Sequence, residues 1–169
     1  MTSSVRQART NDVPSIHRLL DYYAARGQLL PRSLDELTEH ISSFTVINEA
    51  DHLTGCAALE VFTEDLGEVR SLAVRDTAAG VGYGRALVEA IEHNARAIGL
   101  RRLMALTYVP DFFARLGYGI VPMNTLPEKV FGVCVTCPKF RACDEIAVVK
   151  HLDCSRRTHT VCINIPIPS

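Results

Sequence analysis

The stretch SLAVRDTAAGVGYGRAL, residues 71–87, decides the fold class. It begins with the apolar residues of a strand, ends with the start of an amphipathic helix, and places Gly80, Gly82 and Gly84 between them. Glycines allow successive backbone N–H groups to turn towards one point, where the positive end of the helix dipole favours negative charge. The stretch therefore predicts an anion-binding loop between a strand and a helix.

The spacing of these glycines argues against two nucleotide-binding patterns. A dinucleotide-binding fold has G-x-G-x-x-G early in the chain, inside a strand–helix–strand unit, with an acidic residue about 20 positions further on. Here the spacing is G-x-G-x-G, in mid-chain, after residues 44–62 that are expected to form an antiparallel hairpin. A P-loop is absent because no Lys-Ser or Lys-Thr pair follows the glycines. A flexible turn without a ligand stays open as the alternative.

Outward from this loop, hydrophobic periodicity predicts a mixed order of helices and strands. Helices are expected over 13–24, from Ser33 onwards, over 83–98 and over 110–116. Strands are expected over 5–8, 44–48, 54–62, 67–74, 103–107, 118–121 and 145–152. The buried face of the helix over 83–98 should carry Leu87, Ala90, Ile91, Ala95 and Ile98. This order predicts an α/β (α+β) fold, with a mixed, mostly antiparallel sheet flanked by helices. One domain is expected over 1–153, with a C-terminal extension over 154–169.

Composition supports a folded chain of one domain. The 169 residues (18.6 kDa) are 47% hydrophobic and 22% charged, which excludes a disordered chain. A net charge of −1 and a pI near 6.6 argue against nucleic-acid and membrane-surface partners. No run approaches the roughly 20 apolar residues of a membrane span, and no secretion signal is visible at the N-terminus. A cytoplasmic location is expected by default.

The glycine loop resembles motif A of the GNAT acyltransferases, (Gln/Arg)-x-x-Gly-x-(Gly/Ala), with Gly82 and Gly84 as its two glycines. The chain departs from the pattern at Ala79, where the family prefers Gln or Arg. The resemblance implies a GNAT fold and acetyl-CoA as co-substrate. The strand would hold the pantetheine arm through its main chain, and the loop N–H groups would bind the pyrophosphate. The implied cofactor-binding residues are Leu72, Ala73, Val74, Ala79, Gly80, Val81, Gly82, Tyr83, Gly84 and Arg85.

A second segment, PDFFARLGY (110–118), resembles the closing helix of the same family, usually Phe-Tyr-x-x-x-Gly-Phe. Phe113 stands where many members carry a tyrosine that protonates the leaving thiolate, so that acid is missing here. Ser71 and Thr107 are candidate sources of a replacement hydroxyl. The alternative for both is a hydrogen bond to the backbone, which strand hydroxyls make more often.

Two further segments, LLPRSLDEL (29–37) and GEVRSLAV (67–74), resemble the acetyltransferase domain of bacterial N-acetylglutamate synthases. The similarity covers residues 5–153 and is closer to the short, stand-alone form, which shares the runs CVTCPK (134–139) and RACDEIA (141–147). It implies acetyl transfer to the α-amino group of L-glutamate, the first step of arginine biosynthesis. Partners would be acetyl-CoA and L-glutamate, and the oligomeric state is open, with a homodimer as one option.

Two alternatives stay open beside this function. The first is an acetyltransferase for another amino acid or a small amine. The second is a non-catalytic, regulatory acyl-CoA-binding module, which Ala79 and Phe113 favour. Glu68 and Arg32 favour the enzyme, because a module that only binds CoA needs neither.

Acyl transfer to an amine needs a base, and a dicarboxylate substrate suits planar guanidinium groups that bind bidentately. The resemblance implies that Glu68 is the base, acting through a water, and its alternative is a strand carboxylate that faces solvent. By the same resemblance Leu30 and Arg32 lie on the substrate side, and Arg32 binds a substrate carboxylate. Side chains two apart on a strand share a face. Arg70 therefore either binds substrate or pairs with Glu68.

Six cysteines are present, five of them in the last quarter of the chain. Cys134, Cys137 and Cys143 have a spacing that suits a metal ion. A fourth ligand is not obvious, and the candidates are Asp144, His151 and Cys154. Reduced thiols and a redox-sensitive pair are the alternatives, and no metal is expected. Cys56, within an apolar strand, is expected to be a small core residue.

Overall fold

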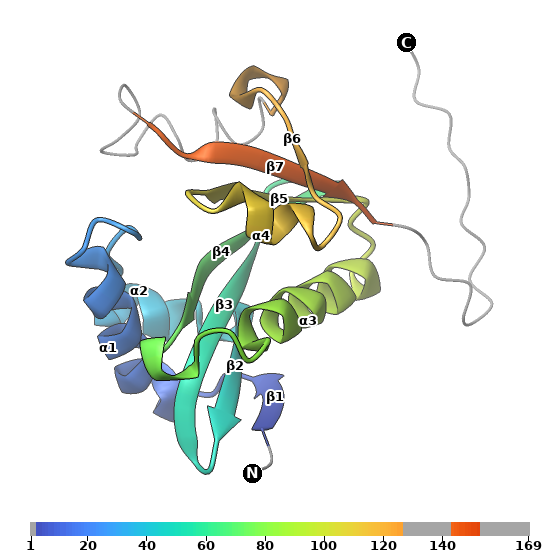
Figure 1. The fold of residues 1–169 in the computed structure, drawn as a ribbon. Coiled ribbons are helices and arrows are strands. Elements are labelled where there is room, and N and C mark those ends of the chain that lie inside the picture. The colour runs from blue at the N-terminus through green and yellow to red at the C-terminus, as the bar shows by residue number, and fades with distance from the viewer. Residues whose placement is uncertain (1–2, 127–142, 153–169) are drawn as a thin grey trace.

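The computed structural model describes residues 3–126 and 143–152 (Figure 1). Its strands are β1 (Ser3–Gln7), β2 (Phe44–Glu49), β3 (His52–Val61), β4 (Leu66–Val74), β5 (Arg102–Thr107), β6 (Gly119–Ile120) and β7 (Ile146–His151). Its helices are α1 (Val13–Ala24), α2 (Leu34–Glu39), α3 (Tyr83–Ala97) and α4 (Pro110–Ala114). Single 3-10 turns occupy Thr10–Asp12, Ile41–Ser43, Asp76–Ala78 and Met123–Thr125. The expected order of elements is confirmed.

The seven strands form one sheet in the order β1-β2-β3-β4-β5-β7-β6. Neighbours are antiparallel except for β4 and β5, which run parallel. The sheet is therefore mixed and mostly antiparallel, as the order of elements predicted.

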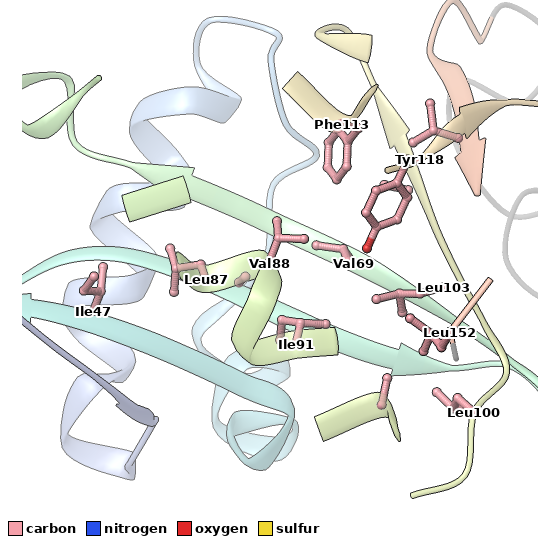
Figure 2. Close-up of a cluster of buried hydrophobic side chains, with 14 residues drawn as sticks. Ile47, Val69, Leu87, Val88, Ile91, Leu100, Leu103, Phe113, Tyr118 and Leu152 are labelled. Atoms are coloured by element: carbon pink, nitrogen blue, oxygen red, sulfur yellow. The ribbon is translucent and has the colours of Figure 1, made fainter. Parts of the chain in front are cut away.

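Helices cover both faces of this sheet (Figure 1). Because successive strand residues point to opposite faces, Val46 packs with α1 and α2 while Ile47 packs with α3. The cluster on the α3 side extends to Phe113 and Tyr118 from the α4–β6 segment (Figure 2). No helix in the described part of the chain is long and apolar enough to cross a bilayer.

The end of α3 differs from expectation. Ile98 was expected on the buried face, but it is 60% exposed. The helix ends at Ala97, and the chain then turns through Gly99, whose φ is +88°. This turn carries Ile98 outward, and Leu100 is buried in its place.

Strands β4 and β5 are paired over only three residues each. Leu66–Glu68 lie beside Arg102–Met104, and no pairing continues towards the carboxyl ends of the two strands. Just beyond that point β4 bulges: Ser71 and Leu72 together oppose a single residue of β3, and Ser71 has a φ of 53°. The bulge bends β4 away from β5, so the last residues of β4 have no neighbouring strand on that side.

Candidate active site

A cavity of about 320 Å³ lies where β4 and β5 separate. The strand ends β4 and β5, the segment that follows α1, and α4 contribute its walls. Its lining residues are Tyr23, Gln28, Leu29, Leu72, Ala73, Val74, Leu106, Thr107, Tyr108, Val109, Phe113 and Glu145. Three of the predicted cofactor-binding residues, those on β4, are therefore brought to one cavity.

The backbone of β4 presents hydrogen-bonding groups to this cavity. The N–H of Arg75 donates to the carbonyl of Thr54, on the β3 side. Because the N–H and C=O groups of successive strand residues point to alternate edges, those of Val74 point to the opposite edge, towards β5. The phenol of Tyr23 donates to the Val74 carbonyl there. The Val74 carbonyl, at the edge of β4 that faces the gap, is thus already hydrogen-bonded to Tyr23.

Tyr23 also connects α1 to Asp76, which begins the 3-10 turn before the glycine loop. Its phenol lies 3.0 Å from Oδ1 of Asp76, and Tyr22 donates to the other carboxylate oxygen. Hydrogen bonds from Tyr22 and then Tyr23 hold the pKa of Asp76 below its ordinary value. Burial and the neighbouring Asp76 carboxylate raise the pKa of Tyr23 to about 12. The sequence pattern gave no signal for these contacts, which span more than fifty residues.

The predicted phosphate loop has the conformation that its glycines allow. Gly80 and Gly82 have φ values of +80° and +90°, and Gly82 is the N-cap of α3. The N–H groups of the first turn of a helix have no partner within the helix, which makes this end of α3 a suitable place for an anion. Gly84 serves a different purpose: a Cβ there would lie 3.3 Å from the ring of Phe112. It allows α3 to approach α4 closely.

Phe113 is 3% exposed and lines the cavity, and within the core its ring contacts Tyr118 edge to face (Figure 2). No hydroxyl is available from this side chain. The Thr107 hydroxyl, also at the cavity, accepts a hydrogen bond from the N–H of Val109 at 2.9 Å. Thr107 thus has the backbone contact that was its alternative, and its role as an acid stays a prediction. Tyr108 brings a phenol to the same cavity, which donates to Asp144 at 2.8 Å and which the sequence analysis missed.

Glu68 is 3% exposed, so the alternative of a solvent-facing carboxylate is wrong. Its Oε2 lies 3.6 Å from Nε of Arg70, which also binds Glu60 on β3. Burial acts to lower the pKa of Arg70, but the carboxylates of Glu68 and Glu60 raise it above its ordinary value. The guanidinium therefore stays charged beside the candidate base.

Arg32 is not a solvated residue either, because its side chain is only 11% exposed. Its guanidinium binds Glu36 through Nε at 2.9 Å and through Nη2 at 2.8 Å, and Nη1 donates to Ser71 Oγ at 3.2 Å. Ser33 caps α2 by accepting from the N–H of Glu36, while the Glu36 carboxylate pairs with Arg32. Leu30, the other residue predicted on the substrate side, is half-buried.

Cys56 lies beneath the bulge of β4 and is fully buried, as expected for a core residue. Its Sγ is 3.5 Å from the Ser71 carbonyl, and burial raises the pKa of the thiol to about 12. Cys143 is exposed, whereas Cys134 and Cys137 lie outside the described residues, as does the extension over 154–169. Within residues 3–126 and 143–152, no group of three His, Cys, Asp or Glu side chains could hold a metal ion.

A mixed sheet that opens beside a glycine loop at a helix N-terminus is the arrangement expected of an acetyl-CoA site. The chain belongs to the acetyltransferase (GNAT) family, whose model matches residues 11–118. It is an enzyme, and its acetyl donor is acetyl-CoA. The fold and the cofactor expected from motif A are thereby confirmed.

Relatives of the chain include amino-acid acetyltransferases. The chain is 40% identical over 148 residues to an uncharacterized N-acetyltransferase from Chlorobaculum tepidum, a match that covers 88% of this chain and 96% of the relative. It is 39% identical over 130 residues to the amino-acid acetyltransferase of Mycobacterium tuberculosis, covering 75% and 74% of the two proteins.

Among solved structures, the chain is similar to N-acetylglutamate synthase from Neisseria gonorrhoeae complexed with coenzyme A and N-acetyl-glutamate. The TM-score is 0.81 with 34% sequence identity, and the match covers 90% of this chain. It covers 36% of the Neisseria chain, so the two proteins share one domain.

Proposed function

We propose that this enzyme transfers the acetyl group of acetyl-CoA to the α-amino group of L-glutamate. The observation that carries the proposal is the cluster of Glu68, Arg70 and Arg32 beside the bulge of β4. A buried carboxylate suits the acceptance of a proton from an ammonium group, and two guanidinium groups suit carboxylates. Similarity to the amino-acid acetyltransferase of Mycobacterium tuberculosis and to the Neisseria synthase bound to N-acetyl-glutamate supports the same substrate class.

In this mechanism Glu68 takes a proton from the α-ammonium group of the substrate through a water. The neutral amine attacks the thioester carbon, while a backbone N–H near Leu72 or Ala73 stabilises the negative charge on the carbonyl oxygen. The nitrogen then loses its second proton, the C–S bond breaks and the amide forms. The thiolate of CoA takes up a proton, and Glu68 releases its own to water, so one proton is released per turnover. Ser71 and Thr107 stay the candidates for the proton that the thiolate takes up, because Phe113 has none to give.

The glycine loop and the first turn of α3 would bind the pyrophosphate of acetyl-CoA, and the β4 main chain its pantetheine arm. Arg32 would bind one carboxylate of L-glutamate, and Arg70 the other. The product would be N-acetyl-L-glutamate, so the enzyme would perform the first step of arginine biosynthesis. A direct transfer within a ternary complex is expected, because the described residues that line the cavity include no nucleophile with a positioned base.

The test is an acetyl-CoA-dependent assay of thiol release across the twenty amino acids, with the product identified by mass spectrometry. The proposal expects the highest kcat/KM for L-glutamate and N-acetyl-L-glutamate as the product. Activity confined to lysine or to polyamines would contradict L-glutamate as the substrate, and the assignment as an acetyltransferase would still hold. Binding of acetyl-CoA without turnover of any amine would instead favour a regulatory acyl-CoA-binding module.

A further inference from the structure

Two carboxylates face each other across strands β3 and β4. Glu60 is the direct partner of Glu68 in the antiparallel register, so both side chains lie on the same face of the sheet. Their exposure differs: the side chain of Glu60 is 34% exposed, whereas that of Glu68 is 3% exposed. Like charges directly opposite each other repel, and the pair persists because Arg70 binds both.

Arg70 makes its contacts with carboxylates of the protein itself. Its Nη1 donates to Oε2 of Glu60, and its Nε lies 3.6 Å from Oε2 of Glu68. Arg32 is likewise paired with Glu36, whose charge also acts on Arg70. These five side chains comprise three carboxylates and two guanidinium groups. The carboxylates of an incoming substrate would therefore meet guanidinium groups that are already bound by carboxylates of the protein.

We propose that Glu60 is a specificity-determining residue, an inference that rests on the proposed function. Its carboxylate binds Arg70 at the position that the side-chain carboxylate of L-glutamate takes when the substrate binds. Glu60 suits this role better than Glu68, because a partly exposed carboxylate moves into water at little cost, whereas a buried one does not. The carboxylate of Glu60 weakens the binding of an anionic substrate because it competes for Arg70. Its removal consequently improves the binding of L-glutamate.

The test compares the Michaelis constants of the unaltered enzyme with those of Glu60→Gln. The amide keeps the shape of the side chain and an acceptor for Arg70, and removes only the charge. The KM for L-glutamate is expected to fall about two- to tenfold, the effect of one partly screened charge, while the KM for acetyl-CoA is unchanged. Asp21→Asn removes the same charge from a carboxylate on α1 that is 52% exposed and lies 3.5 Å from the His17 ring, and it should change neither constant.

Two further variants separate charge from packing. Glu60→Asp keeps the charge and should keep the KM for L-glutamate close to that of the unaltered enzyme. In an enzyme that already carries Arg70→Gln, adding Glu60→Gln should not lower the KM for L-glutamate. The guanidinium for which Glu60 and the substrate compete is then absent.

An unchanged or raised KM for L-glutamate in Glu60→Gln, with thermal stability kept, would overturn this role of Glu60 and leave the proposed function standing. A fall in KM that persists without Arg70 would also overturn it. If the unaltered enzyme does not acetylate L-glutamate, both the proposed function and this inference fail.

Discussion

Arg32 donates a hydrogen bond to the hydroxyl of Ser71, although 39 positions separate the two residues in the sequence. Ser71 is at the bulge of β4, where its φ of 53° is unusual for a residue with a side chain. Arg32 therefore links the segment before α2 to the place where β4 leaves β5. A guanidinium that binds substrate and supports the bulge would couple the amino-acid site to the strand that lines the cofactor cavity.

Replacing Arg32 tests the substrate assignment. Arg32→Ala should raise the KM for L-glutamate by about one to two orders of magnitude, because losing a charged hydrogen-bond partner costs ~1.5–3 kcal/mol. The KM for acetyl-CoA should change far less. Arg32→Lys keeps the charge but not the planar fork, and should recover part of the loss. An unchanged KM for L-glutamate in Arg32→Ala would contradict substrate binding by Arg32 and leave support of the β4 bulge as its role.

Glu68 is the candidate base, and its burial makes the test specific. Glu68→Gln should lower kcat by roughly 10²–10⁴, the range for the loss of a general base, with little change in affinity for acetyl-CoA. Steady-state kinetics and calorimetric titration with CoA measure the two effects separately. An unchanged kcat at neutral pH would remove Glu68 from the mechanism.

The anion site could be predicted from sequence because its determinants are local. Glycines at 80 and 82 are needed where φ is positive, and an amphipathic helix follows directly. The pairing of Arg70 with Glu68 was also open to prediction, because residues two apart on a strand share a face. In both cases a short stretch of chain holds all the information.

The rest of the site depends on contacts that no local pattern encodes. Ser71 lies within residues 67–74, which are expected to form an unbroken strand, yet the register of β3 and β4 shifts there and the strand bulges. Glu60 meets Glu68 only through that register, and Tyr23 reaches Val74 only because α1 packs on the sheet. Such contacts are products of tertiary packing, which the spacing of residues does not reveal.

Tyr23 should make the stability of the fold sensitive to alkaline pH. Its pKa of about 12 in the folded chain exceeds the ordinary value of 10, so the folded state holds the phenol proton more tightly than the unfolded state does. This contribution is complete below pH 10 and is lost as the pH rises from 10 to 12. Tyr23→Phe should therefore lose less stability over that interval in urea titrations. If the free energy of unfolding fell equally with pH in both proteins, the raised pKa of Tyr23 would be contradicted.

A partly buried ion pair between α3 and β7 should be purely structural. Glu92 on α3 is 4% exposed, and both of its oxygens lie 3.0 Å from Nζ of Lys150 on β7. Lys150→Met leaves that carboxylate with the hydrogen bond from Tyr118 and with Arg96, whose Nη1 is 3.7 Å away. The loss of the Lys150 hydrogen bonds should lower the free energy of unfolding by about 1.5–3 kcal/mol. The double variant Glu92→Met with Lys150→Met should be more stable than Lys150→Met alone. A loss of activity in a variant that stays folded would instead show a link to catalysis.

Gly82 and Gly99 form a matched pair for testing the phosphate loop. Gly82 begins α3 with a φ of +90°, and Gly99 follows its end with a φ of +88°. A Cβ at either position would meet no atom within 4 Å, so alanine brings the same strain to both, about 1–2 kcal/mol. Both variants should therefore lose a similar amount of thermal stability.

Only at Gly82 does the backbone lie where the pyrophosphate is expected, so only Gly82→Ala should weaken CoA binding, by roughly tenfold or more in calorimetry. The bulkier Gly82→Val should abolish binding while the fold survives. Equal CoA affinity in Gly82→Ala and Gly99→Ala would show that the loop is a turn without a ligand, and the cofactor would then have to be held by β4 alone.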